Sequence, residues 1–323
     1  MSLNNIIGQD KAVKILKSAV SNRELNGAYL FLGPEGVGKS TVAIEFAKAL
    51  NCEKNNPDAC DECASCNKVN AMNHPDVFII KKEKDSSYIK IDKIRDAIYQ
   101  ASLKPYEGRK KIFLIIDADD MNEEAQNAFL KLLEEPRENQ ILILTTSRVS
   151  GMLPTVISRC KAVKFNLLGQ NQIFGLLMKR QGFSENEAVL FSHMALGSPG
   201  RAMGFKEKDG IKERDRMLND FFFRKRAIFR EDVCDEKKYT DLNESLNMLL
   251  FWYRDMFVSK FTENRGVFLN TDRIEEIFSY AARFSADKLE RDIGSVMKTI
   301  NHIRRNVNPK MALFNMALEL ERQ

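Results

Sequence analysis

The segment from Gly33 to Ser40 has the residue types and spacing of a phosphate-binding loop. It reads GPEGVGKS and matches the pattern G-x-x-x-x-G-K-[ST] in full. An apolar run, 29–32, precedes it, and a stretch with helical character, 41–50, follows it. In such a loop, backbone N–H groups close around phosphate oxygens, the lysine reaches the outer phosphates and the serine ligates Mg²⁺. We therefore predict that the loop binds ATP or ADP with Mg²⁺; an ordinary glycine-rich turn that binds nothing is the alternative. The predicted contacts are Gly33, Gly36, Gly38, Lys39, Ser40 and Thr41.

Asp117 follows a second apolar run, 112–116, and is expected to close a strand. An acidic residue in that place binds Mg²⁺ in P-loop ATPases, whereas the alternative is a solvated aspartate at a strand end. The next residue is Ala118, where ATPases of this architecture normally carry a glutamate that activates water. Asp119 and Asp120 are poor substitutes, because each further residue of backbone moves a carboxylate by roughly 3 Å. We predict a chain that binds nucleotide and hydrolyses it poorly.

A group of cysteines follows the helix after the loop. Cys52, Cys60, Cys63 and Cys66 have the spacing C-x₇-C-x₂-C-x₂-C. Two consecutive C-x-x-C steps wrap a tetrahedral ion and a fourth thiolate completes the set, which favours structural Zn²⁺ over a redox dithiol or an iron–sulfur cluster. His74 precedes a proline and is expected in a loop, not at the metal.

Two basic motifs have both a functional and a structural interpretation. Arg159, in the segment 158–160, is a solvated residue, a partner in an internal salt bridge, or an arginine finger directed at a phosphate on a neighbouring subunit. Three phenylalanines and three basic residues, 221–226, resemble a nucleic-acid contact. A helix that buries the aromatic rings and exposes the cations explains the second motif more simply.

Composition places the chain among globular proteins. With 323 residues, 44% hydrophobic and 29% charged, it is long enough for about two or three domains. No secretory signal is visible near the first residue, and the central apolar run is too short to span a bilayer, so we expect a cytoplasmic protein without a membrane partner. A net charge of +5 permits contact with nucleic acid but does not argue for it.

The elements that must position these residues change in kind along the chain. Apolar runs at 29–32, 77–80, 112–116 and 141–144 alternate with helical patterns at 91–103 and 122–133. This alternation predicts an α/β fold, a parallel sheet covered by helices on both faces. After residue 165 the pattern is helical throughout. We predict a nucleotide-binding domain over 1–165 with its cysteine insert at 52–66, a helical lid over 166–207 and an all-α collar over 208–323.

Taken together, these residues resemble the AAA+ proteins of bacterial clamp loaders, which place the ring-shaped sliding clamp of DNA polymerase III onto primed DNA. The resemblance rests on the phosphate-binding loop, the cysteine insert and three further segments, 128–136, 158–160 and 306–310. It runs in the same order along essentially the whole chain. It implies a RecA-like core, a lid and a collar that joins a heteropentamer.

Two types of subunit in that family must be separated, the ATPase motor (gamma/tau) and the stator-like delta-prime subunit. Ala118 replaces the motor's glutamate, and Arg201 lies one place beyond the position, Gly200, that aligns with the motor's sensor arginine. The chain also ends soon after the collar, without a tau-like extension. These features favour delta-prime, although the phosphate-binding loop is more complete than in the most degenerate members. The resemblance also places the sensor that faces phosphate at Ser147.

The resemblance then implies that Arg159 is a finger that acts in trans, on ATP bound to the adjacent motor subunit. The implied partners are motor subunits, a clamp-opening delta subunit and, through the complex, the clamp and primed DNA. An active motor of the same family is the first rival. A stand-alone zinc-dependent DNA-binding protein is the second, and Asp58, Asp61 and Glu62 argue against it because they make the cysteine segment acidic.

Overall fold

The computed structural model describes residues 2–22, 27–54, 56–83, 86, 88–180, 182–223, 237, 239, 241–305 and 307–321. The basic residues 224–226 and Asn306, which entered the sequence-based predictions, lie outside these ranges. The chain divides into two compact units, residues 1–172 and 173–323. The further division of the helical part into lid and collar remains a prediction.

The first unit is built on one parallel sheet of five strands in the order β2-β3-β4-β1-β5. The predicted α/β class is therefore confirmed, and four of the strands lie where apolar runs predicted them. The fifth was not predicted, because it is an edge strand with two lysines among its five residues and only one buried side chain, that of Val163. The strands are β1 (Gly27–Leu32), β2 (Val77–Ile80), β3 (Lys111–Ile115), β4 (Gln140–Thr146) and β5 (Cys160–Lys164).

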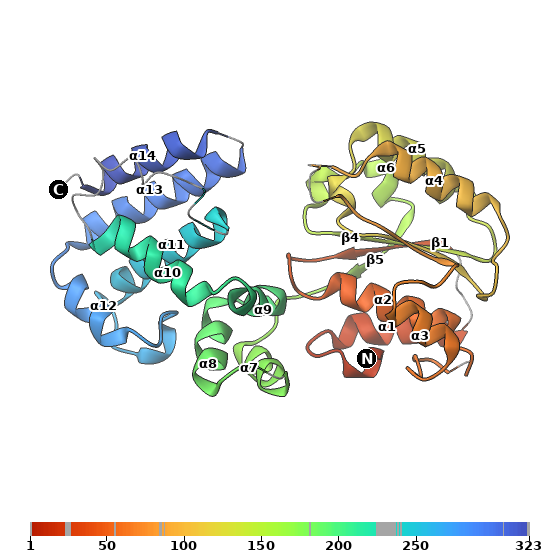
Figure 1. The fold of residues 1–323 in the computed structure, drawn as a ribbon, viewed down its shortest axis with the longest axis horizontal. Coiled ribbons are helices and arrows are strands. Elements are labelled where there is room, and N and C mark those ends of the chain that lie inside the picture. Colours follow the sequence, from red (N-terminus) through yellow and green to blue (C-terminus); the bar gives the residue numbers. More distant parts are fainter. Residues whose placement is uncertain are drawn as a thin grey trace. The chain divides into compact units, whose positions relative to one another are not determined.

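Helices cover both faces of this sheet (Figure 1). Tyr29 and Phe31 of β1 are buried on the face of α1 and α2, and Ala28 and Leu30 are buried on the opposite face. This alternation follows from the two-residue period of a strand. On one face lie α1 (Asp10–Asn22), α2 (Lys39–Asn51) and the shorter α3 (Ala64–Asn70), and on the other α4 (Ile91–Ser102), α5 (Glu123–Glu134) and α6 (Pro154–Ile157).

The second unit is helical in the part that the structure describes, apart from its connecting segments. Its core gathers around the buried Trp252, which packs edge-on against Phe222 with ring centroids 5.7 Å apart. The last helix begins at Pro309, and the Asn308 side chain caps it by accepting from Met311 N at 3.2 Å. The helices are α7 (Gln170–Lys179), which starts at the boundary between the units, α8 (Glu185–Met194), α9 (Pro199–Glu207), α10 (Gly210–Leu218), α11 (Leu242–Val258), α12 (Ile274–Ala281), α13 (Ala286–Arg304) and α14 (Pro309–Glu321).

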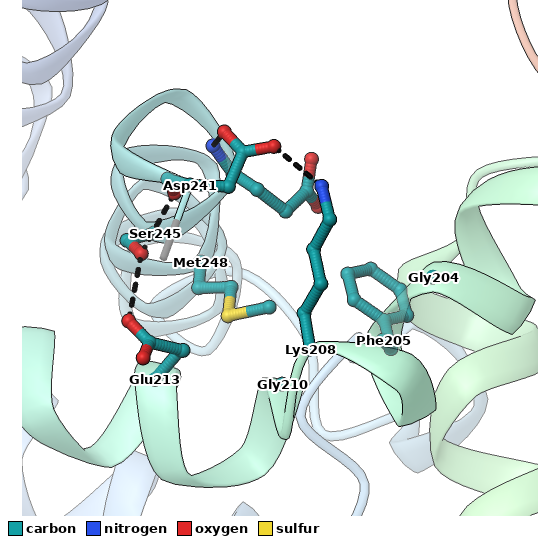
Figure 2. Close-up of a pocket in the computed structure, with 9 residues that line it drawn as sticks. Gly204, Phe205, Lys208, Gly210, Glu213, Asp241, Ser245 and Met248 are labelled. Carbon is teal, nitrogen blue, oxygen red and sulfur yellow. Dashed lines mark hydrogen bonds and ion pairs between the residues drawn. The ribbon is translucent and has the colours of Figure 1, made fainter. Parts of the chain in front are cut away.

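A small hollow lies between α9, α10 and α11 (Figure 2). Its walls include Phe205 and Met248, and ion pairs and hydrogen bonds such as Lys208–Asp241 close its rim. The volume is about 10 Å³, room for about one water molecule and no larger ligand. Among the described helices of the chain, none combines the length and the apolar character that crossing a membrane requires.

Candidate nucleotide and metal sites

The phosphate-binding loop joins the end of β1 to the first turn of α2, at the carboxyl edge of the sheet. Gly36 and Gly38 have φ angles of 73° and 97°, in the left-handed region that side chains disfavour. Gly33 is required for a different reason, because a Cβ atom there would lie 2.5 Å from the carbonyl oxygen of Phe165. The three glycines therefore give the loop its shape and leave its N–H groups beside the amino end of a helix.

Lys39 is the first residue of α2, and its ammonium group points back into the loop. Its Nζ donates to the carbonyl oxygens of Gly33 and Pro34, both at 2.7 Å. Burial lowers the pKa of Lys39, and the nearby carboxylate of Asp117 opposes that shift. Ser40 is half-buried beside it and Thr41 is exposed. A cation, a helix amino end and a hydroxyl fit the phosphates and Mg²⁺ of a nucleotide, so the chain has the donor set that the prediction requires.

Asp117 lies two residues beyond β3, because the strand ends at Ile115 and not at Ile116 as expected. The residue is left-handed, with a φ of 53°, and its N–H donates to Thr145 Oγ1 at 2.9 Å. Asp117 is exposed to solvent, as the alternative of a solvated aspartate requires. Partial desolvation by its surroundings raises the pKa of Asp117, and the positive charge of Lys39 acts in the opposite direction. Lys39 and Asp117 therefore lie close enough that the charge of each one opposes the pKa shift of the other. The Mg²⁺ role of Asp117 remains a prediction.

The carboxylate of Asp119 is fully engaged within the domain. Thr146 Oγ1 donates to its Oδ1 at 2.7 Å, and Arg148 Nε donates to its Oδ2 at 3.0 Å. Asp120 is paired with Lys82 at 2.8 Å, and Ala118 is completely buried. The two carboxylates that follow Ala118 along the chain are thus held by partners, so neither is free to take the place of a catalytic glutamate in this arrangement.

The sequence indicated Thr146 only as the neighbour of the predicted sensor Ser147, and it indicated neither the contact of Thr146 with Asp119 nor that of Arg148. Thr146 is the last residue of β4 and pairs in register with Leu32, immediately before the loop. The end of the strand locates this position, but the apolar run 141–144 stops two residues before the strand ends. The sequence alone therefore did not locate it. Ser147, the predicted sensor, is exposed one residue beyond the strand. Its proposed contact with phosphate stays a prediction.

Arg159 lies in the turn between α6 and β5, on the surface of the first unit. Its Nη2 is 2.8 Å from Glu134 Oε1, and its Nη1 donates to the carbonyl oxygen of Thr155 at 3.0 Å. The side chain is 37% exposed, so the ion pair lies at the surface of the domain. The structure therefore contains the internal salt bridge that the sequence left as one alternative.

Arg201 is engaged within the second unit. Its Nε lies 2.8 Å from Glu244 Oε1 on α11, and its guanidinium group lies 5.1 Å from the centre of the Phe251 ring. A cation over an aromatic ring and against a carboxylate links α9 to α11. This role accounts for the arginine without any contact to a nucleotide.

The four predicted cysteines lie together. Their sulfur atoms are all within 4.8 Å of one another, and the Sγ atoms of Cys60 and Cys66 are 4.0 Å apart. Zinc–sulfur bonds of about 2.3 Å in a tetrahedron separate the sulfurs by about 3.8 Å, so the group fits Zn²⁺. Backbone N–H groups of Glu62 and Cys63 lower the pKa of the Cys60 thiol to about 6, whereas burial raises the pKa of the Cys52 and Cys66 thiols. Metal binding would therefore have to displace protons from those two thiols. In the described part of the chain no histidine joins the cluster.

With this geometry established, comparisons with known proteins indicate the family. A family model described as "DNA polymerase III, delta subunit" matches residues 8–168, and one described as "DNA polymerase III, delta subunit, C terminal" matches residues 208–322. The chain belongs to the DNA polymerase III delta subunit family. The resemblance to clamp-loader AAA+ proteins seen in the sequence is thereby confirmed.

Two curated relatives come from Bacillus subtilis (strain 168). DNA polymerase III subunit delta' is 27% identical over 97% of this chain and 96% of the relative. DNA polymerase III subunit tau is 28% identical over 85% of this chain, which spans only 53% of tau. Among solved structures, a DNA polymerase III gamma subunit-related protein from Thermotoga maritima MSB8 matches with a TM-score of 0.50 and 18% identity. That match covers 97% of this chain and 99% of the other, and it supports the fold alone.

Proposed function

We propose that this clamp-loader family member is a delta-prime-type stator, which supplies Arg159 in trans to a neighbouring ATPase subunit during loading of the sliding clamp onto primed DNA. The observation that carries the proposal is the position of Arg159 on the surface, with a side chain that is 37% exposed and an exposed ion-pair partner, Glu134. A planar fork of N–H donors stabilises negative charge that develops on a transferred phosphoryl group.

Residues at the phosphate-binding loop support a role other than hydrolysis in this chain. We propose that Lys39, Ser40 and Asp117 hold ATP or ADP with Mg²⁺. The buried methyl group of Ala118 offers no base for an attacking water, and Asp119 is tied to Thr146 and Arg148. Turnover by the chain itself is therefore expected near background.

Similarity to delta' over nearly the full length of both chains favours the stator over the motor. In the proposed complex the partners are gamma/tau motor subunits and a clamp-opening delta subunit. The helices from residue 208 onward, with exposed α14 side chains such as Met311 and Phe314, serve as the collar, and residues 166–207 serve as the lid. We further propose that Cys52, Cys60, Cys63 and Cys66 hold structural Zn²⁺.

The test is reconstitution of the complex with Arg159→Ala in place of the wild-type chain. The variant should assemble normally and lower both DNA-stimulated ATP hydrolysis and clamp loading. A trans finger is worth about 10³–10⁵ in rate at its own site, and other sites in a pentamer keep theirs, so the total loss is smaller. Lys161→Ala, which removes an exposed cation two residues away, is the matched control and should load clamps at the wild-type rate.

A wild-type loading rate for a correctly assembled Arg159→Ala complex would contradict the role of Arg159 as a trans arginine finger. The chain would then be a stator with a structural role alone. Strong ATP turnover by the isolated chain that Lys39→Ala abolishes would instead identify a motor subunit.

A further inference from the structure

Lys48, on helix α2, has a side chain that is completely buried. Its Nζ lies 2.7 Å from Glu45 Oε2 and 2.9 Å from Asn70 Oδ1, and it also contacts Asp61 Oδ1. Three side-chain oxygens thus surround an ammonium group that has three N–H donors. A buried charge is tolerated only with partners of this kind.

These partners come from two different parts of the first unit. Glu45 belongs to α2 itself, whereas Asp61 lies between Cys60 and Cys63 and Asn70 ends α3. Asp61 has a φ of 60°, a left-handed conformation that is uncommon for a residue other than glycine.

Helix α3, which carries Asn70, starts at the cysteines. Cys63 caps it, and the Cys63 Sγ accepts from Cys66 N at 3.4 Å. The Asp61 and Asn70 oxygens around Lys48 therefore depend on the structure of the segment that carries the cysteines.

Helix α2 connects the two sites directly. Lys39 is its first residue and Cys52 caps its last turn, so one helix of about 20 Å carries the phosphate-binding lysine at one end and a thiol at the other. Lys48 lies in the last turn, close to the thiol end. A shift of this turn acts on the helix that supplies Lys39 and Ser40 to the phosphate-binding loop.

We propose that Lys48 is a positioning residue that couples the cysteine cluster to the phosphate-binding helix, so that Zn²⁺ at the four thiols stabilises α2 and raises its affinity for MgADP. The inference rests on the proposed function for both ligands. When the cysteine segment loosens, Asp61 and Asn70 move away and leave the buried ammonium with Glu45. Because an ammonium that loses its partners is costly to keep buried, the end of α2 must rearrange.

Coupling between two sites is reciprocal, which gives two independent readouts on the full chain. The first is the affinity for MgADP of the zinc-loaded and the chelator-treated protein, measured by calorimetry. The second is the equilibrium affinity for zinc, measured by competition with a chromogenic chelator, with and without saturating MgADP. Couplings of about 5- to 150-fold are typical; we expect about tenfold weaker MgADP binding without zinc and zinc binding that is tighter by the same factor with MgADP.

In Lys48→Met, zinc should change the affinity for MgADP by less than about twofold, and MgADP should change zinc binding by less than about twofold. This expectation does not depend on the overall stability of the variant. Lys54→Met is the matched control. Lys54 pairs with Glu62 in the same cysteine segment, but both side chains are mainly exposed, so the coupling should persist. Where Lys48→Met fails to fold, Asp61→Asn removes the partner's charge from the less buried side and should reduce the coupling in the same way.

Equal MgADP affinity with and without zinc in the wild-type chain would overturn the inference, as would full coupling in Lys48→Met. If zinc-loaded protein binds no MgADP, the proposed nucleotide site is wrong, and hydrogen exchange of the α2 amides decides the inference by itself. Slower exchange with zinc that disappears in Lys48→Met supports the coupling, and exchange that is independent of zinc overturns it.

Discussion

Arg159 and Glu134 form an ion pair between the turn before β5 and the last residue of α5, with 2.8 Å between Nη2 and Oε1. Both side chains are more than one-third exposed, and pairs of this kind contribute only about 0–1 kcal/mol to stability. An arginine held so weakly is oriented by the carboxylate yet can leave it for a stronger anion. The pair therefore agrees with a residue that exchanges an internal partner for one on another subunit.

Glu134→Gln should change the free energy of unfolding by less than about 1 kcal/mol, because the pair is solvent-screened. In the reconstituted complex it should keep the ATPase rate at or slightly above the wild-type value, since the competing carboxylate charge is gone. Arg159→Lys should behave like Arg159→Ala, because an ammonium keeps the charge but loses the planar fork. Loss of activity in Glu134→Gln as large as that in Arg159→Ala would show that the pair matters for structure, not for exchange.

The cysteine cluster should hold one Zn²⁺ per chain in native protein, as measured by elemental analysis. Cys63→Ser should release it and loosen residues 52–66, because Cys63 is both a ligand and the cap of α3. The sheet should stay folded by circular dichroism. Cys160→Ser is the control: burial raises the pKa of the Cys160 thiol to about 12 and it lies outside the cluster, so this variant should keep its zinc. Native protein with clearly substoichiometric zinc would refute the site.

The phosphate-binding loop should bind MgADP measurably in calorimetry, and Lys39→Ala should abolish binding, since the lysine is the cation within the loop. The isolated wild-type chain should turn over ATP near background. Ala118→Glu is expected to restore at most a small rate, because Asp119 remains bound to Thr146 and Arg148 and no neighbour supplies a finger. Unaltered MgADP affinity in Lys39→Ala would show that the loop does not hold the nucleotide.

Sequence patterns predicted most of the strands and helices that position these sites. The contacts that they did not predict share one cause, which is that the partners are far apart in the sequence. The glycines, Lys39 and the cysteine spacing are local signals, because chemistry fixes residue types at short separations. From the sequence pattern alone, Lys48 is expected to be an ordinary exposed lysine on a helix. Its burial appears only when Asp61 and Asn70 fold over it from 13 and 22 residues away. The contact between Thr146 and Asp119 was not predicted for the same reason, since Asp119 lies in the connection that follows a different strand.

Asp76 provides a test of how acid acts on the first unit. Burial by itself raises the pKa of this carboxyl, but N–H donors of Gly108, Glu107 and Tyr106, at 2.7–2.8 Å, outweigh it and hold the pKa below its usual value. A lowered native pKa stabilises the fold above the unfolded-state pKa of about 3.9, and this contribution disappears as pH falls through the native value.

Asp76→Asn should therefore lower the free energy of unfolding at neutral pH by about 1.5–3 kcal/mol, the range for hydrogen bonds to a charged group. It should also flatten the acid limb of the stability curve below about pH 4. Urea titrations at a series of pH values measure both effects. An unchanged acid limb would mean that other carboxyls dominate it.

Arg201 distinguishes a structural arginine from a nucleotide sensor. Its ion pair with Glu244 is about three-quarters buried, with side chains 22% and 24% exposed, and its guanidinium group lies over Phe251. Cation–π contacts contribute about 0.5–2 kcal/mol. Arg201→Ala should therefore lower the stability of the second unit by roughly 1–2 kcal/mol in urea titrations, while MgADP affinity stays within about twofold. Glu244→Gln should show part of the same loss, and the two changes should be non-additive because the residues are in contact. A tenfold or larger loss of MgADP affinity in Arg201→Ala, with the affinity of Glu244→Gln unchanged, would instead show that Arg201 contacts the nucleotide. That result would favour a motor subunit.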